Sequence, residues 1–346
     1  MRNLIISTMR NEAPFILEWI AYHLHIGFTD FLIYSNDCDD GTDLLLDRLQ
    51  ELGIVRHERN HSGGKKPVQW RALTKAARTD IVDKADWIYV TDVDEFLNIH
   101  VGDGRLTDLI AAAPDAAGFA LPWRMFGNNG VDGFVDVPVT TQFTQAAPDA
   151  LVWPWRAVQF KSLYRNDNSY DKLGVHQPAL NGKTQPNWVD GNGNSCPMNG
   201  GTVHHLTGTR YGLAQINHYA CGSMQGFLVK KARGKPNHIS EEFDITYWIE
   251  RNISEVVDRS IQRHTVPVQA KVDELMTDTV LADLHHRGVA WRQAKIAKLL
   301  QTPDGFALYA ALRQTPPTVA LPMAEQRHLL AQLVAIRRKE LAQKSM

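Results

Sequence analysis

Short apolar segments alternate with amphipathic ones through the first 120 residues, and this alternation constrains the fold more than any other feature. Buried strands are predicted over 4–6, 31–34, 54–55 and 87–90. Helices are predicted from Asn11, as the N-cap, to Gly27, and over 42–52 and 68–84. Strands that alternate with helices through short connections form a mostly parallel sheet with helices on both faces. The predicted fold class is therefore α/β.

Polar residues follow three of the predicted strands, at 7–10, 35–37 and 91–94. In an open α/β sheet, ligands bind beyond the carboxyl ends of the strands. These residues are therefore expected to converge at one edge of the sheet, where they suit a polar ligand or a metal ion.

The most informative strand end is the segment 91–96, which contains Asp92 and Asp94. Residues i and i+2 of an extended segment point the same way, so both carboxylates would face one ion if the chain stays extended. Two buried carboxylates repel each other unless a cation compensates them. Hard oxygen ligands suit Mg²⁺ or Mn²⁺, which also bind phosphate oxygens. The alternative is a turn capped by acids, which the strongly apolar preceding strand disfavours.

The pattern changes after residue 120. The stretch 181–201 is rich in Asn and Gly, contains Trp188 and Asp190, and is predicted as a loop that closes over the site or holds a substrate. Further along the chain, the sequence predicts strands over 202–206 and 215–220, a helical pattern over 241–263, and helices beyond about residue 270.

Taken in order, several of these segments resemble the GT-A fold glycosyltransferases near glycosyltransferase families 2 and 92. The resemblance rests on 6–12, Glu18-Trp19 with His23, 34–37 with 40–42, 87–96, and a later block of 216–219 with Phe227, Lys230 and Arg233-Gly234. It covers roughly residues 3 to 125 and 202 to 260. It implies transfer of a sugar from a nucleotide sugar, expected to be UDP-linked, to a glycan, glycolipid or other hydroxyl acceptor. Inversion is expected, with Mn²⁺ or Mg²⁺ held by Asp92 and Asp94.

The resemblance also implies a domain organisation. A GT-A domain is expected over 1–265, with a nucleotide-sugar-binding half at 1–125, an acceptor half at 126–265, and a helical region at 266–346. The family tends to carry a Lys and then acidic residues after the His-Tyr pair, where this chain has Gly222, Gln225 and Gly226. A different acceptor, or a catalytic base supplied from elsewhere, is therefore expected.

Roles for individual residues follow from the same resemblance. Nucleotide-sugar binding is assigned to Thr8, Arg10, Asn11, Asn36, Asp37, Arg71 and Asp92. A helix that begins near Asn11 favours an anion at its N-terminus, and Arg10 suits a diphosphate. His218 is the predicted third metal ligand, with His205 as the alternative. Asp190 is the predicted catalytic base, because acids are sparse in this region and Trp188 would stack on a sugar.

Charge and cysteine content restrict the partners and the compartment. The formal net charge of −1 argues against a nucleic-acid binder, which normally carries a basic excess. The three cysteines are scattered, and no signal peptide or transmembrane run is apparent, which predicts a cytoplasmic protein. Residues 327–346 carry five basic residues and one acid beside an apolar stripe. This helix either packs on the domain or lies peripherally on the inner face of an anionic membrane.

Two other functions stay open from the sequence. A nucleotidyltransferase also places acids at α/β strand ends, but it usually carries a Gly-rich, basic first loop, which residues 7–11 lack. The non-enzymatic alternative is a carbohydrate-binding scaffold on a degenerate GT-A fold, which the departures at Gly222 and Gln225 leave open.

Overall fold

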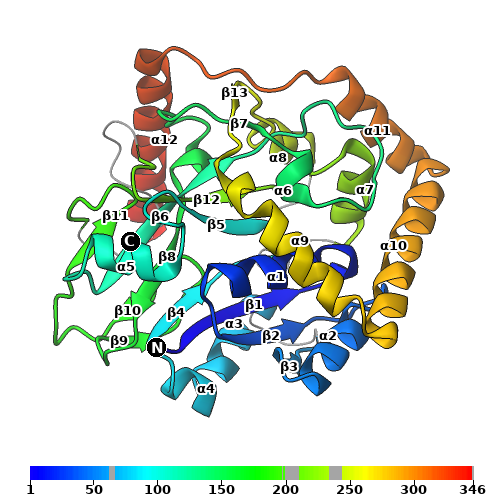
Figure 1. Ribbon diagram of the computed structural model, residues 1–346. Helices are drawn as coiled ribbons and strands as arrows, with labels where there is room; N and C mark the ends of the chain where they lie inside the picture. The colour runs from blue at the N-terminus through cyan, green and yellow to red at the C-terminus, as the bar shows by residue number, and fades with distance from the viewer. Residues whose placement is uncertain (62–66, 197, 199–209, 234–243, 345–346) are drawn as a thin grey trace.

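The structure, a computed structural model, describes residues 1–61, 67–196, 198, 210–233 and 244–344. Within these residues the main sheet has nine strands, in the order β3-β2-β1-β4-β8-β6-β12-β5, with β11 beside β6 (Figure 1). They are β1 (Asn3–Met9), β2 (Asp30–Ser35), β3 (Arg56–Arg59), β4 (Trp87–Val90), β5 (Glu95–Ile99), β6 (Gly118–Met125), β8 (Phe160–Arg165), β11 (Trp188–Asp190) and β12 (Ala214–His218). Two small sheets pair β9 (Tyr170–Lys172) with β10 (Ala179–Leu180), and β7 (Gln145–Ala146) with β13 (Val256–Val257).

Most neighbouring strands of the main sheet are parallel, as predicted. β1 runs parallel to β2 and β4, β2 to β3, and β6 to β11 and β12. β8 is antiparallel to β4 and β6, and β5 to β12. The third strand spans Arg56–Arg59 and not 54–55; it is an edge strand of polar residues, which a search for apolar runs does not find. β12 confirms the strand predicted over 215–220, whereas the strand predicted over 202–206 lies outside the described residues.

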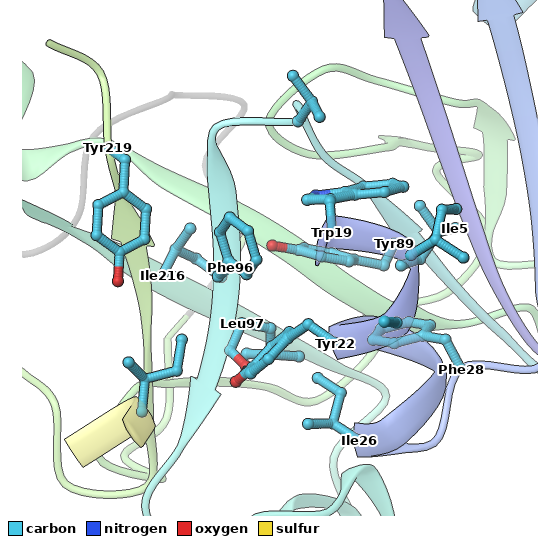
Figure 2. Packing of buried hydrophobic residues seen from close by; sticks show 14 of the residues in the cluster. Ile5, Trp19, Tyr22, Ile26, Phe28, Tyr89, Phe96, Leu97, Ile216 and Tyr219 are labelled. Carbon is cyan, nitrogen blue, oxygen red and sulfur yellow. The ribbon is translucent and has the colours of Figure 1, made fainter. Parts of the chain in front are cut away.

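Helices cover both faces of the sheet, which confirms the α/β class. These helices are α1 (Ile16–Ile26), α2 (Thr42–Glu51), α3 (Val68–Ala76) and α4 (Asp80–Asp83). On the face of α1 and α2, Ile5 of β1 packs in one core with Trp19, as Figure 2 shows. On the face of α3 and α4, Leu4 of the same strand packs in a second core with Leu73. Alternate residues of β1 therefore serve opposite cores, and the whole strand is buried.

Three predicted helices differ from the observed ones. The helix predicted over 68–84 is interrupted, because Thr79 has extended backbone (φ −105°, ψ 144°) between α3 and α4. Asn11 does not cap α1: it has a left-handed φ of 57°, and the 3-10 helix η1 (Ala13–Phe15) precedes α1. The Ala13 amide donates instead to Asp40 (3.0 Å). Within 244–263, α8 (Ile245–Ile249) and the start of η3 (Ser260–His264) are the helical parts.

A helical region ends the chain, as predicted. It contains α9 (Thr265–Leu275), α10 (Thr279–Leu300), α11 (Pro303–Gln314) and α12 (Met323–Lys344). α9 packs on α1, and α10 packs on η1, α2 and α7 (Met224–Arg233). α12 lies at one edge of the molecule (Figure 1), where Leu330 packs with Val152 and Val158. None of the described helices is long and apolar enough to cross a membrane. The short helices α5 (Leu106–Ala112), α6 (Val139–Gln142) and η2 (Trp155–Val158) complete the described elements.

Candidate active site

The chain turns after β4 and does not stay extended through the acidic segment. Val93 and Asp94 form the turn, and the Glu95 amide donates to the Asp92 carbonyl (3.1 Å). The condition under which Asp92 and Asp94 would face one ion as extended neighbours is therefore not met. Each carboxylate is bound instead to a different lysine from a distant element.

Asp92 is held by Lys161 of β8. The Lys161 ammonium lies 2.9 Å from the Asp92 carboxylate and 3.3 Å from Glu95, and the Lys161 side chain is fully buried. Gln69 of α3 also donates to Asp92 (3.3 Å). Glu95 accepts from the Thr91 hydroxyl (2.8 Å) and the Asp92 amide (3.0 Å). Burial raises the pKa of Glu95 to about 8; the Lys161 ammonium opposes this effect and the Asp92 charge adds to it.

Asp94 is held by Lys230 of α7 and faces His218 of β12. Lys230 Nζ lies 2.7 Å from one Asp94 oxygen, and His218 Nε2 lies 3.9 Å from the other. Burial alone would raise the pKa of Asp94, but the Lys230 ammonium holds it well below its usual range, so the carboxylate is ionised. Burial lowers the pKa of His218 to about 3, which keeps the imidazole neutral. An ionised carboxylate beside a neutral imidazole is a donor set that a divalent cation accepts.

Strand pairing fixes His218 beside the acidic turn. In the antiparallel pair of β12 and β5, His218 lies opposite Glu95. β12 also runs parallel to β6, where His218 is level with Met125. The segments 87–96 and 216–219, which carry much of the sequence resemblance, therefore meet at one edge of the sheet.

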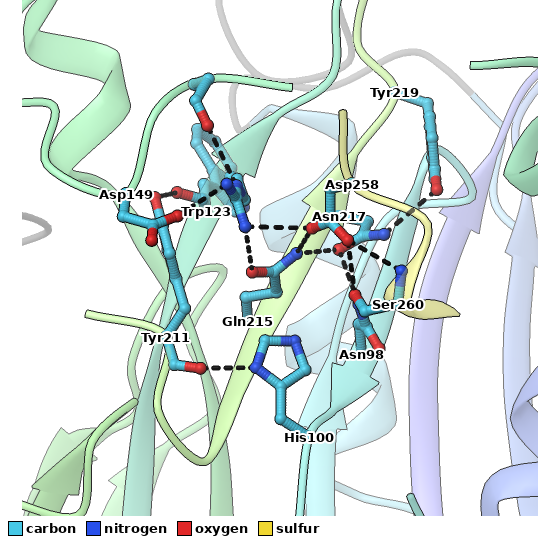
Figure 3. Close-up of polar contacts among 12 residues, drawn as sticks. Asn98, His100, Trp123, Asp149, Tyr211, Gln215, Asn217, Tyr219, Asp258 and Ser260 are labelled. Carbon is cyan, nitrogen blue, oxygen red and sulfur yellow. Dashed lines mark hydrogen bonds and ion pairs between the residues drawn. The ribbon is translucent and has the colours of Figure 1, made fainter. Parts of the chain in front are cut away.

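A hydrogen-bonded network on the opposite face of β12 supports this arrangement (Figure 3). Gln215 and Asn217 alternate with His218 along the strand, so their side chains leave the sheet on the other face. Asp258 accepts from Arg124 of β6 (3.0 Å) and from Gln215 (2.8 Å), and Gln215 also donates to Asn217 (2.7 Å). The network joins β6 and β12 to the segment before η3 and so fixes the strand that carries His218.

Asp94 and Lys230 line a cavity with about 70 Å³ of space for the centres of water-sized spheres, or about 700 Å³ of empty volume when the open solvent at its mouth is included. Glu12, between β1 and η1, and Arg233 of α7 line the same cavity and form an ion pair. The side chains of Arg10 and Arg233 each donate to the other residue's carbonyl oxygen (3.0 Å in both cases). The end of β1 and the end of α7 are thereby joined at the wall of the cavity.

Five of the residues predicted to bind the nucleotide lie at the ends of β1 and β2, and the side chains of two of these, Asn11 and Asn36, bind neighbouring loops. Asn11 is buried, and its side-chain oxygen accepts from the Asp39 amide (2.8 Å). Asn36 is buried and accepts from the side chain of Asn60 (2.8 Å). Thr8 is also buried, but its hydroxyl has no hydrogen-bond partner among the described residues. Asn11 and Asn36 therefore stabilise the loops, whereas the Thr8 hydroxyl retains its bonding capacity.

Asp37 and Arg71 meet at His61, on the rim beyond β2. Asp37 has a left-handed φ of 44°, and its carboxylate lies 3.3 Å from His61 Nδ1. Arg71 of α3 donates to the His61 carbonyl. The side chains of Asp37 and Arg71 are both partly exposed, so this rim presents one carboxylate and one guanidinium beside the strand ends.

The structure does not bring Asp190 to this cavity. Asp190 ends β11 and is level with Ala120 of β6, whereas His218 is level with Met125, which is about 16 Å further along at the usual strand rise. The Asp190 carboxylate accepts from the Asn192 amide (2.8 Å) and so closes a turn. Trp188 is 2% exposed, which removes it as a platform for a sugar. The expected loop is therefore partly a strand of the sheet, and the argument for Asp190 as the base is lost.

A metal ion would have to share this site with its substrate. Among the described residues, no group of three His, Cys, Asp or Glu side chains is placed to hold one ion. The 3.9 Å between Asp94 and His218 is short enough for one ion to contact both. Mg²⁺ usually takes one or two protein carboxylates and completes its shell with water and substrate phosphates. Asp94 and His218 therefore fit a metal ion that completes its coordination with a phosphate ligand. His205, the alternative third ligand, lies outside the described residues.

Two residues of the site were not assigned from the sequence. Lys161 is a fully buried lysine between Phe160 and Ser162 of β8, and a lysine is almost never fully buried without an acidic partner. Glu12 follows Asn11 in the first loop, where nothing in the sequence indicates that it faces Arg233 and the cavity.

The comparisons with known sequences agree on one family. A family model described as Glycosyltransferase family 92 matches residues 6–247. A family 92 protein of Oryza sativa subsp. japonica is 27% identical over 156 residues, which are 42% of this chain and 25% of that protein. A family 92 protein of Arabidopsis thaliana is 32% identical over 96 residues, or 27% of this chain and 16% of that protein. The chain thus matches about a quarter or less of the length of these curated relatives.

Similar solved structures are more distant. S. aureus TarS is 16% identical, over 48% of this chain and 28% of TarS, with a TM-score of 0.28. A 4-diphosphocytidyl-2C-methyl-D-erythritol synthase is 15% identical, over 49% of this chain and 78% of that protein, with a TM-score of 0.28. Likenesses this weak carry no argument about this chain.

Proposed function

The chain belongs to glycosyltransferase family 92, and from this membership we propose that it transfers a sugar from a UDP-linked donor to a hydroxyl group of a glycan or glycolipid acceptor. The observation that supports the proposal is the meeting of Asp94, His218 and Lys230 at a cavity beyond the carboxyl end of β4. That edge of an α/β sheet is where such folds bind their ligands.

The donor diphosphate is proposed to lie along the cations of this edge. Arg10 and Arg233 are joined at the end of β1, and Lys230 lies beside Asp94. Guanidinium and ammonium groups bind phosphate through charge-assisted hydrogen bonds. The Thr8 hydroxyl, which has no hydrogen-bond partner within the described part of the chain, would contact the nucleoside, as would Asp37 and Arg71 at the rim.

A Mn²⁺ or Mg²⁺ ion is proposed to be held by Asp94 and His218, with Asp92 beside it. When bound, such an ion would neutralise the charge that develops on the departing diphosphate. Lys161 and Gln69 fix the orientation of Asp92, and Lys230 fixes that of Asp94. The carboxylates of Asp92 and Asp94 are thus oriented by side chains of this protein and do not need the metal ion to position them.

We assign the catalytic base to Glu12 in place of Asp190. Among the described residues that line the cavity, Glu12 and Asp94 carry the carboxylates, and Asp94 is assigned to the metal. In an inverting transfer, the acceptor oxygen bonds to the anomeric carbon and the bond from that carbon to the diphosphate breaks. The hydroxyl proton then passes to Glu12, which Arg233 orients.

The test is hydrolysis and transfer from a panel of nucleotide sugars, with added Mn²⁺ or with a chelator. We expect turnover of at least one UDP-sugar that the chelator abolishes and that Asp94→Asn lowers about a hundredfold or more. Asp171→Asn, on an exposed position of β9, is the matched control and should keep full activity.

Other outcomes separate the competing functions. If the chelator leaves the turnover of the nucleotide sugar unchanged, the reaction does not depend on a divalent metal ion. Release of pyrophosphate from a nucleoside triphosphate and a sugar phosphate would indicate a nucleotidyltransferase. Binding of glycans without turnover of any nucleotide sugar would indicate a carbohydrate-binding scaffold.

The peripheral membrane contact through α12, on the cytoplasmic side, stays a proposal. Leu330 packs on the domain and Arg337 stacks on Trp155 (4.1 Å to the ring centroid), which occupies part of the apolar and basic surface of the helix. Ile336 is 55% exposed beside the exposed Arg338 and Lys339. Flotation with anionic vesicles tests the contact, and loss of flotation in Ile336→Ser would assign it to this end of the helix.

A further inference from the structure

The cavity that contains Asp94 has mainly apolar walls. The side chains of Phe15, Phe134, Val135, Val137, Val139 and Phe143 line it. Its uncharged polar side chains among the described residues are Gln142, Ser223 and Tyr219, and the Tyr219 hydroxyl already accepts from Asn217 (3.1 Å). Its charged side chains are engaged within the protein, Asp94 with Lys230, Glu12 with Arg233, and Arg292 with the Gly226 carbonyl. A bare sugar presents hydroxyl groups all round, and each needs a hydrogen-bond partner when it leaves water. Among the lining residues within 134–143, only the Gln142 side chain could supply one.

The apolar wall is held in place by polar contacts behind it. Asp132 accepts from the Tyr309 hydroxyl of α11 (2.9 Å), and Asp136 lies 3.0 Å from His285 Nε2 of α10. These two contacts bracket Phe134 and Val135. The segment 132–137 is therefore anchored at both ends to the C-terminal helices while its apolar side chains face the cavity.

Arg292 of α10 fixes the aromatic part of the same wall. Its guanidinium lies 4.8 Å from the Phe15 ring centroid and 5.2 Å from that of Phe134. It also donates to the Gly226 carbonyl of α7 (3.2 Å). The two rings, 6.2 Å apart, are thus locked in an edge-to-face arrangement. This part of the wall is therefore held in place by contacts within the chain itself.

Part of this wall stays open to water. Val135 is 50% exposed and Val137 is 47% exposed, although both line the cavity. Apolar side chains held rigidly at the mouth of a cavity favour an apolar ligand group, because its binding removes both surfaces from water.

We propose that the acceptor carries an apolar aglycone next to the hydroxyl that receives the sugar, and that this cavity binds the aglycone. The inference rests on the proposed transferase function, since Asp94 and the proposed base Glu12 line the same cavity. An alkyl chain and an aromatic ring are both apolar enough to bind this wall, and the experiment below distinguishes between them.

The first experiment measures binding without a donor. Calorimetry compares octyl, phenyl and methyl glycosides of the same sugars, with the octyl compound kept below its micelle concentration. We expect the octyl or the phenyl glycoside to bind at least about tenfold more tightly than the methyl glycoside, and the tighter of the two identifies the aglycone. Equal affinity of all three would overturn the inference.

Matched variants locate the binding. Val137→Ser and Val135→Ser should each lower the preference for the apolar glycoside several-fold. Val280→Ser, at a position of α10 that is 49% exposed and does not line the cavity, should leave the preference unchanged. An unchanged preference in both cavity variants would show that the apolar group binds elsewhere and would overturn the assignment.

The second experiment measures transfer to the same glycosides. If a nucleotide sugar is hydrolysed but KM is the same for methyl, phenyl and octyl acceptors, the inference fails and the proposed function stands. If apolar glycosides bind in the cavity but no nucleotide sugar is turned over with any acceptor, the proposed function fails and the apolar site stands.

Discussion

Lys230 Nζ lies 2.7 Å from the Asp94 carboxylate, although 136 positions separate the two residues in the chain. The contact joins the turn after β4 to α7, and Lys230 donates in addition to the Ala220 carbonyl (2.6 Å). The ammonium neutralises Asp94 in the absence of other cations. A divalent ion at Asp94 therefore binds beside an existing positive charge, which makes its affinity depend on the anionic donor.

The Asp94–Lys230 pair is expected to be strongly coupled. Lys230→Met leaves a largely buried carboxylate without its cation and should lower the free energy of unfolding by about 3 kcal/mol. Lys230→Met combined with Asp94→Asn should cost less than the sum of the single changes by about 1 kcal/mol or more. Urea unfolding measures all four proteins, and Lys231→Met, at the exposed neighbouring position, is the control. Strict additivity would show that the contact carries no coupling.

Lys161 is expected to be essential for stability. It is fully buried between Asp92 and Glu95, so Lys161→Met should lower the free energy of unfolding by about 3–5 kcal/mol. Asp92→Asn in the same chain should restore part of this loss, because it removes the negative charge that Lys161 contacts at 2.9 Å. Lys172→Met, at an exposed position of β9, serves as the control in the same thermal or urea unfolding series. If the Lys161→Met protein is as stable as the wild type, Lys161 does not stabilise the fold through Asp92 and Glu95.

His23 is expected to make the fold sensitive to acid. It is fully buried, it donates from Nδ1 to the Trp19 carbonyl (2.9 Å), and burial lowers its pKa to about 3. Because this folded-state pKa lies below the unfolded value of about 6.5, stability is complete above pH 6.5 and is lost as the pH falls towards 3.

The contribution of His23 is isolated by comparing the wild type with His23→Phe at pH 7 and pH 5. The wild type should lose about 2 kcal/mol more than the variant over this interval, since one proton contributes at most about 1.4 kcal/mol per pH unit. Equal losses in the two proteins would show that other groups carry the acid sensitivity.

Glu12 is expected to act on the transfer step. Glu12→Gln should lower kcat for transfer about a hundredfold or more, because the amide cannot accept the acceptor proton. Glu12→Asp should retain part of the activity, and both variants are checked for folding by circular dichroism. A Glu12→Gln enzyme with the kcat of the wild type would exclude Glu12 as the base.

The first strands of the sheet, and the position of the acids at its edge, could be predicted because the sequence patterns that indicate them are local. β1, β2 and β4 appear in the sequence as apolar runs, and the acids that follow β4 stand at a predictable edge of a parallel sheet. The block around His218 was found by its resemblance to a family. These features need only a few neighbouring residues to be recognised.

The partners of the two acids could not be predicted, because they depend on long-range strand order. Lys161 reaches Asp92 from 69 positions away, since β8 inserts antiparallel between β4 and β6. Nothing in the composition of 160–165 indicates that insertion. Asp190 was misplaced for the same reason: its Asn- and Gly-rich surroundings suggest a loop, yet Trp188 and Val189 pair with β6.

The anchoring of the cavity wall has a consequence for how relatives of this protein diverge. The wall around Phe134 is held by His285, Arg292 and Tyr309, whereas the family match ends at residue 247. The acids and lysines assigned to the donor lie within the matched residues, and the supports of the proposed acceptor wall lie beyond them. Exchange or drift of the C-terminal helices would change the choice of acceptor while leaving the donor residues intact. Relatives that share the opening motifs but end in unlike helices are expected to have different acceptors.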